Sequence, residues 1–91
     1  MDRTRPPEHP GAILQRQYLE PLLMSVERLS EVTHIPQTRL EQFVQGTISL
    51  DVWMAYEFAI YFETTVQLWL NLQIRYDNFY KGNEHGYQFY G

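Results

Sequence analysis

The residues whose chemistry stands out are uncharged polar side chains that follow Pro36, namely Gln37, Thr38 and Gln42. On a helix of 3.6 residues per turn these three positions share one broad face with Glu41, and all four side chains are placed to meet base edges. Glutamine can form two hydrogen bonds with the N6 and N7 atoms of adenine, worth about 1–3 kcal/mol of discrimination, and threonine can contact a thymine methyl group. The pattern predicts recognition of base edges in duplex DNA. The alternative is that these are ordinary solvated residues on an exposed helix.

The segment that must position these side chains is predicted to be two short helices joined by a tight turn at residues 33–35. Each half of the segment carries an apolar stripe at helical spacing: Val26, Leu29 and Val32 in the first, and Leu40, Phe43 and Val44 in the second. Ser25 is a suitable N-cap, Pro36 suits a first helical turn, and Gly46 suits the position just after a helix. A pair of helices of this kind places its second helix in the major groove of DNA.

Positive charge is scarce in this segment, where Arg28 and Arg39 are outnumbered by Glu27, Glu31 and Glu41. DNA attracts proteins mainly through Lys and Arg, which displace counterions from phosphates. Arg39 is expected to contact a phosphate or a guanine, and Arg28 or an arginine of the N-terminal arm is expected to contact a second phosphate. With about two phosphates neutralised per subunit, a dimer would lose affinity with a logarithmic salt slope of about −3.6. The predicted binding is weak and salt-sensitive. The full set of candidate DNA-binding residues is Gln37, Thr38, Arg39, Gln42, Gln45, Thr47 and Arg28.

Apolar residues elsewhere recur every three or four positions, and alternation at period two never persists, which predicts an all-α domain of five helices. A first helix should follow Gly11 and end near Glu20, because Pro21 cannot continue it. Asp51 or Ser49 can cap the fourth helix. The buried stripe expected on that helix is Val52, Ala55, Tyr56, Ala59 and Phe62.

The fifth helix is expected to run from about residue 66 to about residue 80, with Thr64 or Thr65 as its cap. Prolines make residues 1–10 an extended N-terminal arm, so the domain should occupy residues 11–81. Residues 82–91 form a glycine-containing aromatic tail.

Composition narrows the possible functions of this 91-residue chain, which has no cysteine and a formal net charge of −4. A chain of this size forms one domain, and disulfide, thiolate-metal and cysteine-nucleophile chemistry are excluded. His9, His34 and His85 have no metal-ligand spacing, and no catalytic motif occurs, so we expect neither metal, cofactor nor enzymatic activity. No apolar run resembles a membrane span or a signal peptide, which favours a cytoplasmic protein.

Aromatic residues surround the predicted fourth helix more completely than one core-facing stripe can absorb. Some of them should be covered by a partner, which predicts a homodimer. The candidate interface residues are Trp53, Trp69, Tyr76, Phe79 and Tyr80. For Trp69 the alternative is burial within its own chain.

Several motifs carry a family resemblance that spans about residues 5–80. They are Arg5-Pro6-Pro7, His9-Pro10-Gly11, Leu19-Glu20-Pro21-Leu22, Ile35-Pro36, Gly46 and Trp69-Leu70-Asn71-Leu72-Gln73 followed by Tyr76-Asp77. Through them the chain resembles the HigA/VapI-like antitoxin branch of the Xre-type (Cro/repressor-like) helix-turn-helix proteins of bacteria. This chain has His34 and Glu63 where members usually have a small residue or glycine, and Thr47 where they have a basic residue.

The resemblance implies a lambda-repressor-like fold and a sequence-specific transcriptional regulator. It also implies an antitoxin-like autorepressor of a type II toxin-antitoxin module, acting as a homodimer on a palindromic operator and binding a small basic toxin. The alternative is a divergent scaffold that has lost DNA binding and serves as a protein-interaction module.

Overall fold

The computed structural model describes residues 6–80, and within this range all regular structure is helical. The elements are α1 (Pro10–Ile13), η1 (Leu14–Leu19), α2 (Glu20–Leu22), α3 (Val26–Thr33), α4 (Gln37–Val44), α5 (Val52–Phe62) and α6 (Val66–Tyr80). The first three are consecutive and form one helical run, so the expected all-α fold of five helices is confirmed. The aromatic tail at residues 82–91 lies outside the described residues. None of the described helices is long and apolar enough to cross a bilayer.

The first helical run extends to Leu22, so the expected end near Glu20 is wrong. Its middle part, η1, is π-helical, and the Glu20 N–H bonds the carbonyl of Gln15. Proline lacks an N–H and its ring collides with the preceding turn of a regular α-helix. The wider π-turn relieves this conflict, because Pro21 then falls in the first turn of α2, where no N–H is required.

The helical run begins at Pro10, two residues earlier than predicted, and His9 is its N-cap. The His9 Nδ1 atom accepts a hydrogen bond of 2.9 Å from the Gly11 N–H. A Cβ atom at Gly11 would lie 1.7 Å from the Phe43 carbonyl oxygen, so only glycine lets α1 approach the backbone of α4 this closely. The His9-Pro10-Gly11 motif therefore joins the start of the domain to the end of α4.

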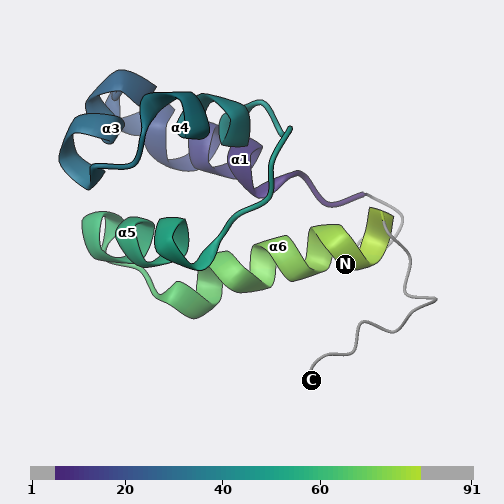
Figure 1. Ribbon diagram of the computed structural model, residues 1–91. Coiled ribbons are helices and arrows are strands. Elements are labelled where there is room, and N and C mark those ends of the chain that lie inside the picture. Colours follow the sequence, from purple (N-terminus) through teal and green to yellow (C-terminus); the bar gives the residue numbers. More distant parts are fainter. Residues whose placement is uncertain (1–5, 81–91) are drawn as a thin grey trace.

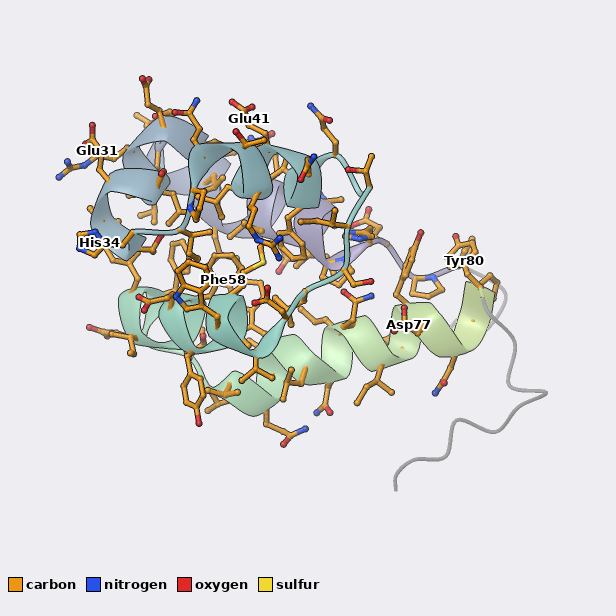
Figure 2. All side chains as sticks on the ribbon, in the orientation of Figure 1. Glu31, His34, Glu41, Phe58, Asp77 and Tyr80 are labelled. Atoms are coloured by element: carbon orange, nitrogen blue, oxygen red, sulfur yellow. The ribbon has the colours of Figure 1, made fainter. Side chains whose placement is uncertain are left out.

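Figure 1 shows two groups of helices: α1, α3 and α4 lie together on one side, and α5 and α6 form a hairpin on the other. The core between them contains Leu14, Leu19, Leu29, Ile35, Leu40, Phe43, Met54, Ala55, Phe58 and Trp69, all fully buried. Figure 2 places Phe58 between the two groups. Its ring centroid is 5.0 Å from that of Trp69 and 5.8 Å from that of Phe43, so aromatic packing links α4, α5 and α6.

The stripe predicted for α5 is partly wrong, because Val52 and Tyr56 are exposed while Met54 and Phe58 are buried. Apolar residues occur all round this helix, so periodicity alone did not identify the side that faces the core. The predicted N-cap is confirmed: Asp51 Oδ1 accepts a 2.8 Å hydrogen bond from the Met54 N–H.

Among residues 6–80, three non-glycine residues end helices in the left-handed conformation: Leu23, His34 and Glu63, with φ of 54°, 64° and 59°. Two of them are the positions where the resemblance leads one to expect a small residue or glycine. The fold is thus retained, although each non-glycine residue in the left-handed conformation costs on the order of 1 kcal/mol of stability. Gly46, with φ of 83°, occupies the predicted position after α4.

Candidate nucleic-acid interface

The turn between α3 and α4 is held by short-range hydrogen bonds. Ser25 caps α3 by accepting a 3.0 Å hydrogen bond from the Arg28 N–H, as its sequence position predicts. At the other end, the buried Thr33 hydroxyl donates to the Leu29 carbonyl at 2.7 Å and accepts from the Ile35 N–H at 3.3 Å. Pro36 is the N-cap of α4 and precedes its first turn. These contacts fix α4 relative to α3.

One face of α4 is exposed along its whole length, opposite the buried Leu40 and Phe43. The exposed residues are Gln37, Thr38, Glu41, Gln42 and Gln45. At 100° per residue they fall within one arc of the helix. The structure therefore brings together four of the uncharged residues predicted to bind DNA. The acidic residue Glu41 shares their face, as its helical position predicts, and Figure 2 shows it on the side facing away from α5 and α6.

Gln37 and Glu41 are paired on this face, one helical turn apart. The Gln37 Nε2 atom donates a 2.9 Å hydrogen bond to Glu41 Oε2. The pair holds both side chains at the N-terminal half of α4, where they are open to solvent.

Arg39 lies at the border of this face, and its side chain turns toward the start of α5. Its Nη2 atom is 2.7 Å from Asp51 Oδ2, and Asp51 is also the N-cap of α5. The other predicted phosphate contact, Arg28, has its Nη1 atom 2.9 Å from Glu31 Oε1 on the same helix. Both candidate cations thus have carboxylate partners.

Thr47 closes the loop after α4 through two hydrogen bonds. The Thr47 hydroxyl donates to the Gln42 carbonyl at 3.1 Å, and the Thr47 N–H bonds the same oxygen at 2.9 Å. Thr47 therefore uses its hydroxyl proton within the protein.

The His9 ring packs edge-on against Phe43 and Tyr76, with centroids 5.5 and 4.9 Å away. Burial lowers the pKa of His9 below its ordinary value, and a hydrogen bond with the backbone of Ile48 and the charge of Asp77 oppose this effect. The neutral imidazole suits the site, because its Nδ1 atom must accept a hydrogen bond from the Gly11 N–H.

Gln73 is a positioning residue that chemical reasoning from the sequence missed. It is 7% exposed, and its Oε1 atom accepts a 2.8 Å hydrogen bond from the buried Leu50 N–H in the loop between α4 and α5. Its Nε2 atom donates to Asp77 Oδ1 at 2.9 Å. The signal was present in the Trp69-Leu70-Asn71-Leu72-Gln73 motif, whose last residue is now explained.

The predicted interface residues separate into two groups. Trp53, Phe79 and Tyr80 are exposed, and Tyr76 is half-buried against the His9 ring. Trp69 is 0% exposed, and its Nε1 atom donates a 2.8 Å hydrogen bond to Thr64 Oγ1. Placing Trp69 at a subunit interface was wrong, because its ring fills the core of its own chain.

Comparison with curated proteins finds related sequences that are helix-turn-helix (HTH) transcriptional regulators. The chain is 39% identical over 74 residues to the HTH-type transcriptional regulator YbaQ of Escherichia coli K12, covering 81% of this chain and 66% of that protein. It is 35% identical over 74 residues to an HTH-type transcriptional regulator of Haemophilus influenzae, covering 81% and 69% of the two. This chain belongs to the HTH-type transcriptional regulators. This HTH-type regulator is also 33% identical over 72 residues to virulence-associated protein I of Dichelobacter nodosus, covering 79% and 67%.

No family model matches the HTH-type regulator. Solved structures share its fold, including PA4674 of Pseudomonas aeruginosa in complex with its 28-bp operator DNA, with a TM-score of 0.81, 28% identity and 91% coverage of both chains. The Pseudomonas aeruginosa antitoxin HigA with the higBA promoter matches with a TM-score of 0.79, 28% identity and coverage of 90% and 96%. The resemblance to the HigA/VapI-like branch is confirmed. The regulator spans about two thirds, 66%, of the length of YbaQ.

Proposed function

We propose that this chain is a sequence-specific DNA-binding regulator that acts as an antitoxin-like autorepressor, as a homodimer on a palindromic operator. The observation that carries the proposal is the exposed face of α4, which presents amides and a hydroxyl on a fold shared with proteins solved on operator DNA. Base edges would be contacted by Gln37, Thr38 and Gln42. The sugar-phosphate backbone of the DNA would lie against Gln45 and Thr47. Repression would follow from occupancy of the operator, without catalysis, in the cytoplasm.

Arg39 and Arg28 are proposed as the phosphate contacts, but each is shared with a carboxylate, Asp51 or Glu31. A phosphate must compete with that carboxylate, so counterion release per subunit is smaller than the number of arginines implies. The affinity of one domain for DNA would therefore be low. Simultaneous binding of two domains to half-sites about 34–36 Å apart would raise the overall affinity for the operator.

The dimer surface is proposed to include Trp53, Tyr76, Phe79 and Tyr80. Trp53 has exposed apolar neighbours on α5, namely Val52, Tyr56 and Ile60. In the dimer the partner subunit would cover this stripe and so remove these apolar side chains from water.

A small basic toxin is the proposed second partner. The chain carries a net charge of −4, and complementary potentials accelerate association and favour the correct partner. The toxin would bind away from the exposed face of α4, so the toxin-bound regulator would still bind DNA.

The direct test is electrophoretic mobility of the DNA upstream of the gene at two salt concentrations. We expect a retarded complex at low salt that weakens at higher salt and is lost in the Gln37→Ala, Gln42→Ala double variant. A Gln17→Ala variant is the matched control, because Gln17 is an exposed glutamine on η1. No retarded complex, or equal affinity of the double variant, would contradict the proposal. A stable complex with another protein by a domain that ignores all DNA would instead favour the interaction module.

A further inference from the structure

Glu41 is an acidic residue on a face that the proposed function places against DNA, where a negative charge is repelled by the phosphates. Resting on that proposed function, we propose that Glu41 determines sequence specificity, and that its carboxylate, held by Gln37, accepts a hydrogen bond from the N4 amino group of a cytosine in the major groove.

The geometry keeps the Glu41 carboxylate in place without neutralising it. Gln37 Nε2 donates to Glu41 Oε2 at 2.9 Å, which leaves Glu41 Oε1 as a free acceptor direction on the exposed face. Within residues 6–80, the arginines of α3 and α4 are paired with other carboxylates, those of Glu31 and Asp51. Neither of these arginines pairs with Glu41, and a carboxylate can only accept hydrogen bonds.

A charged acceptor selects among the base pairs by what each presents in the major groove. Guanine presents two acceptors, thymine presents one acceptor and a methyl group, and adenine presents an acceptor beside its amino group. Cytosine alone presents a donor with no adjacent acceptor of its own. Glu41 is therefore repelled by guanine and thymine, is disfavoured by the N7 acceptor beside the amino group of adenine, and is most compatible with cytosine. The hydrogen bond with cytosine also offsets the repulsion from the phosphates.

Gln37 acts through Glu41 as a positioning residue in this arrangement. Its amide fixes one carboxylate oxygen, so fewer side-chain rotamers are lost when Glu41 meets a base. Its own carbonyl oxygen is a further acceptor beside Glu41, which reinforces the preference for a donor on the base edge.

The test is selection of duplexes from a randomised DNA library by the full chain, compared with Glu41→Gln. The wild type is expected to enrich one cytosine per half-site, with a preference of about 5- to 150-fold over other bases. Glu41→Gln should lose the preference at that position only. Glu27→Gln is the matched control, because Glu27 is an exposed acid on α3. Each variant removes one charge that the phosphates repel, so both should bind DNA that lacks this cytosine more tightly, but only Glu27→Gln should keep the cytosine preference.

A second measurement needs no variant. N4-methylcytosine at the selected position keeps the proton used in base pairing and replaces the proton that faces the major groove, so the wild type should bind this duplex more weakly by a similar factor. Retention of the same preference by Glu41→Gln, or undiminished binding to the methylated duplex, overturns the role of Glu41 while the proposed function stands. If the wild type enriches no sequence at all, the proposed function fails and this inference fails with it.

Discussion

The guanidinium of Arg39 lies 2.7 Å from the carboxylate of Asp51, and this ion pair joins α4 to the N-cap of α5. The same carboxylate accepts a hydrogen bond from the Met54 N–H, so one side chain caps α5 and positions α4. The only basic residue of α4 is thus held by an intramolecular partner. This explains how a predicted phosphate contact also serves the packing of two helices.

Release of Arg39 is expected to strengthen DNA binding. Asp51→Asn keeps an efficient N-cap but removes the charge that competes with phosphate. The magnitude of the salt slope should rise by up to about 0.9 per subunit, and stability should fall by only about 0.2–1 kcal/mol, because the pair is partly exposed. The measurement is DNA affinity at several salt concentrations. Glu63→Gln, which removes a charge at the other end of α5, should leave the slope unchanged; an equal slope in Asp51→Asn would show that Arg39 does not reach phosphate.

Loss of the Gln73 side chain is expected to destabilise the loop before α5. Gln73→Ala leaves the buried Leu50 N–H without its partner, which costs about 1–3 kcal/mol. Gln67→Ala, an exposed glutamine on the same helix, should change stability by less than about 0.5 kcal/mol. Urea unfolding measures both. Equal stabilities of the two variants would mean that water replaces the hydrogen bond to Leu50.

Acid is expected to destabilise the domain through His9. Its pKa is lower in the folded state than in the unfolded chain, where it is about 6.5. The contribution of His9 is fully present above pH 6.5, and it falls as the pH drops through that value, because the unfolded chain then binds a proton that the folded domain does not. The free energy of unfolding of His9→Asn, which can still cap α1, should therefore depend less on pH between 7.5 and 5.5. Parallel pH profiles of the two proteins would contradict this.

Glycine at Leu23 is expected to raise stability. Leu23 is 94% exposed and has φ of 54°, so its side chain contributes strain without burial. Relief of that strain, less the entropy that glycine adds to the unfolded chain, gives a gain of about 0.5–1 kcal/mol in thermal or urea unfolding. Arg75→Gly, at an exposed position inside α6, should lose about 1 kcal/mol by comparison. A loss of stability in Leu23→Gly would show that Leu23 makes a stabilising contact.

The sequence by itself determined the helices and their ends, because these depend on hydrogen bonds between residues a few positions apart. Ser25 and Asp51 cap the helices that they were expected to cap, Gly46 ends α4, and the alignment of polar residues on one side of α4 follows from the helical repeat. The predicted end of the first helical run, just before Pro21, was wrong, because the π-turn that accommodates this proline has no marked local signal in the sequence.

Only the tertiary structure decided which side chains are free to act. Apolar residues surround α5, so the burial of Phe58 and the exposure of Tyr56 depend on how α5 packs against the rest of the domain. The partner of Arg39 lies 12 residues away, and Gln73 reaches a backbone N–H 23 residues away. Contacts of this range arise when helices come together in space, and the spacing of residues along one helix carries no information about them.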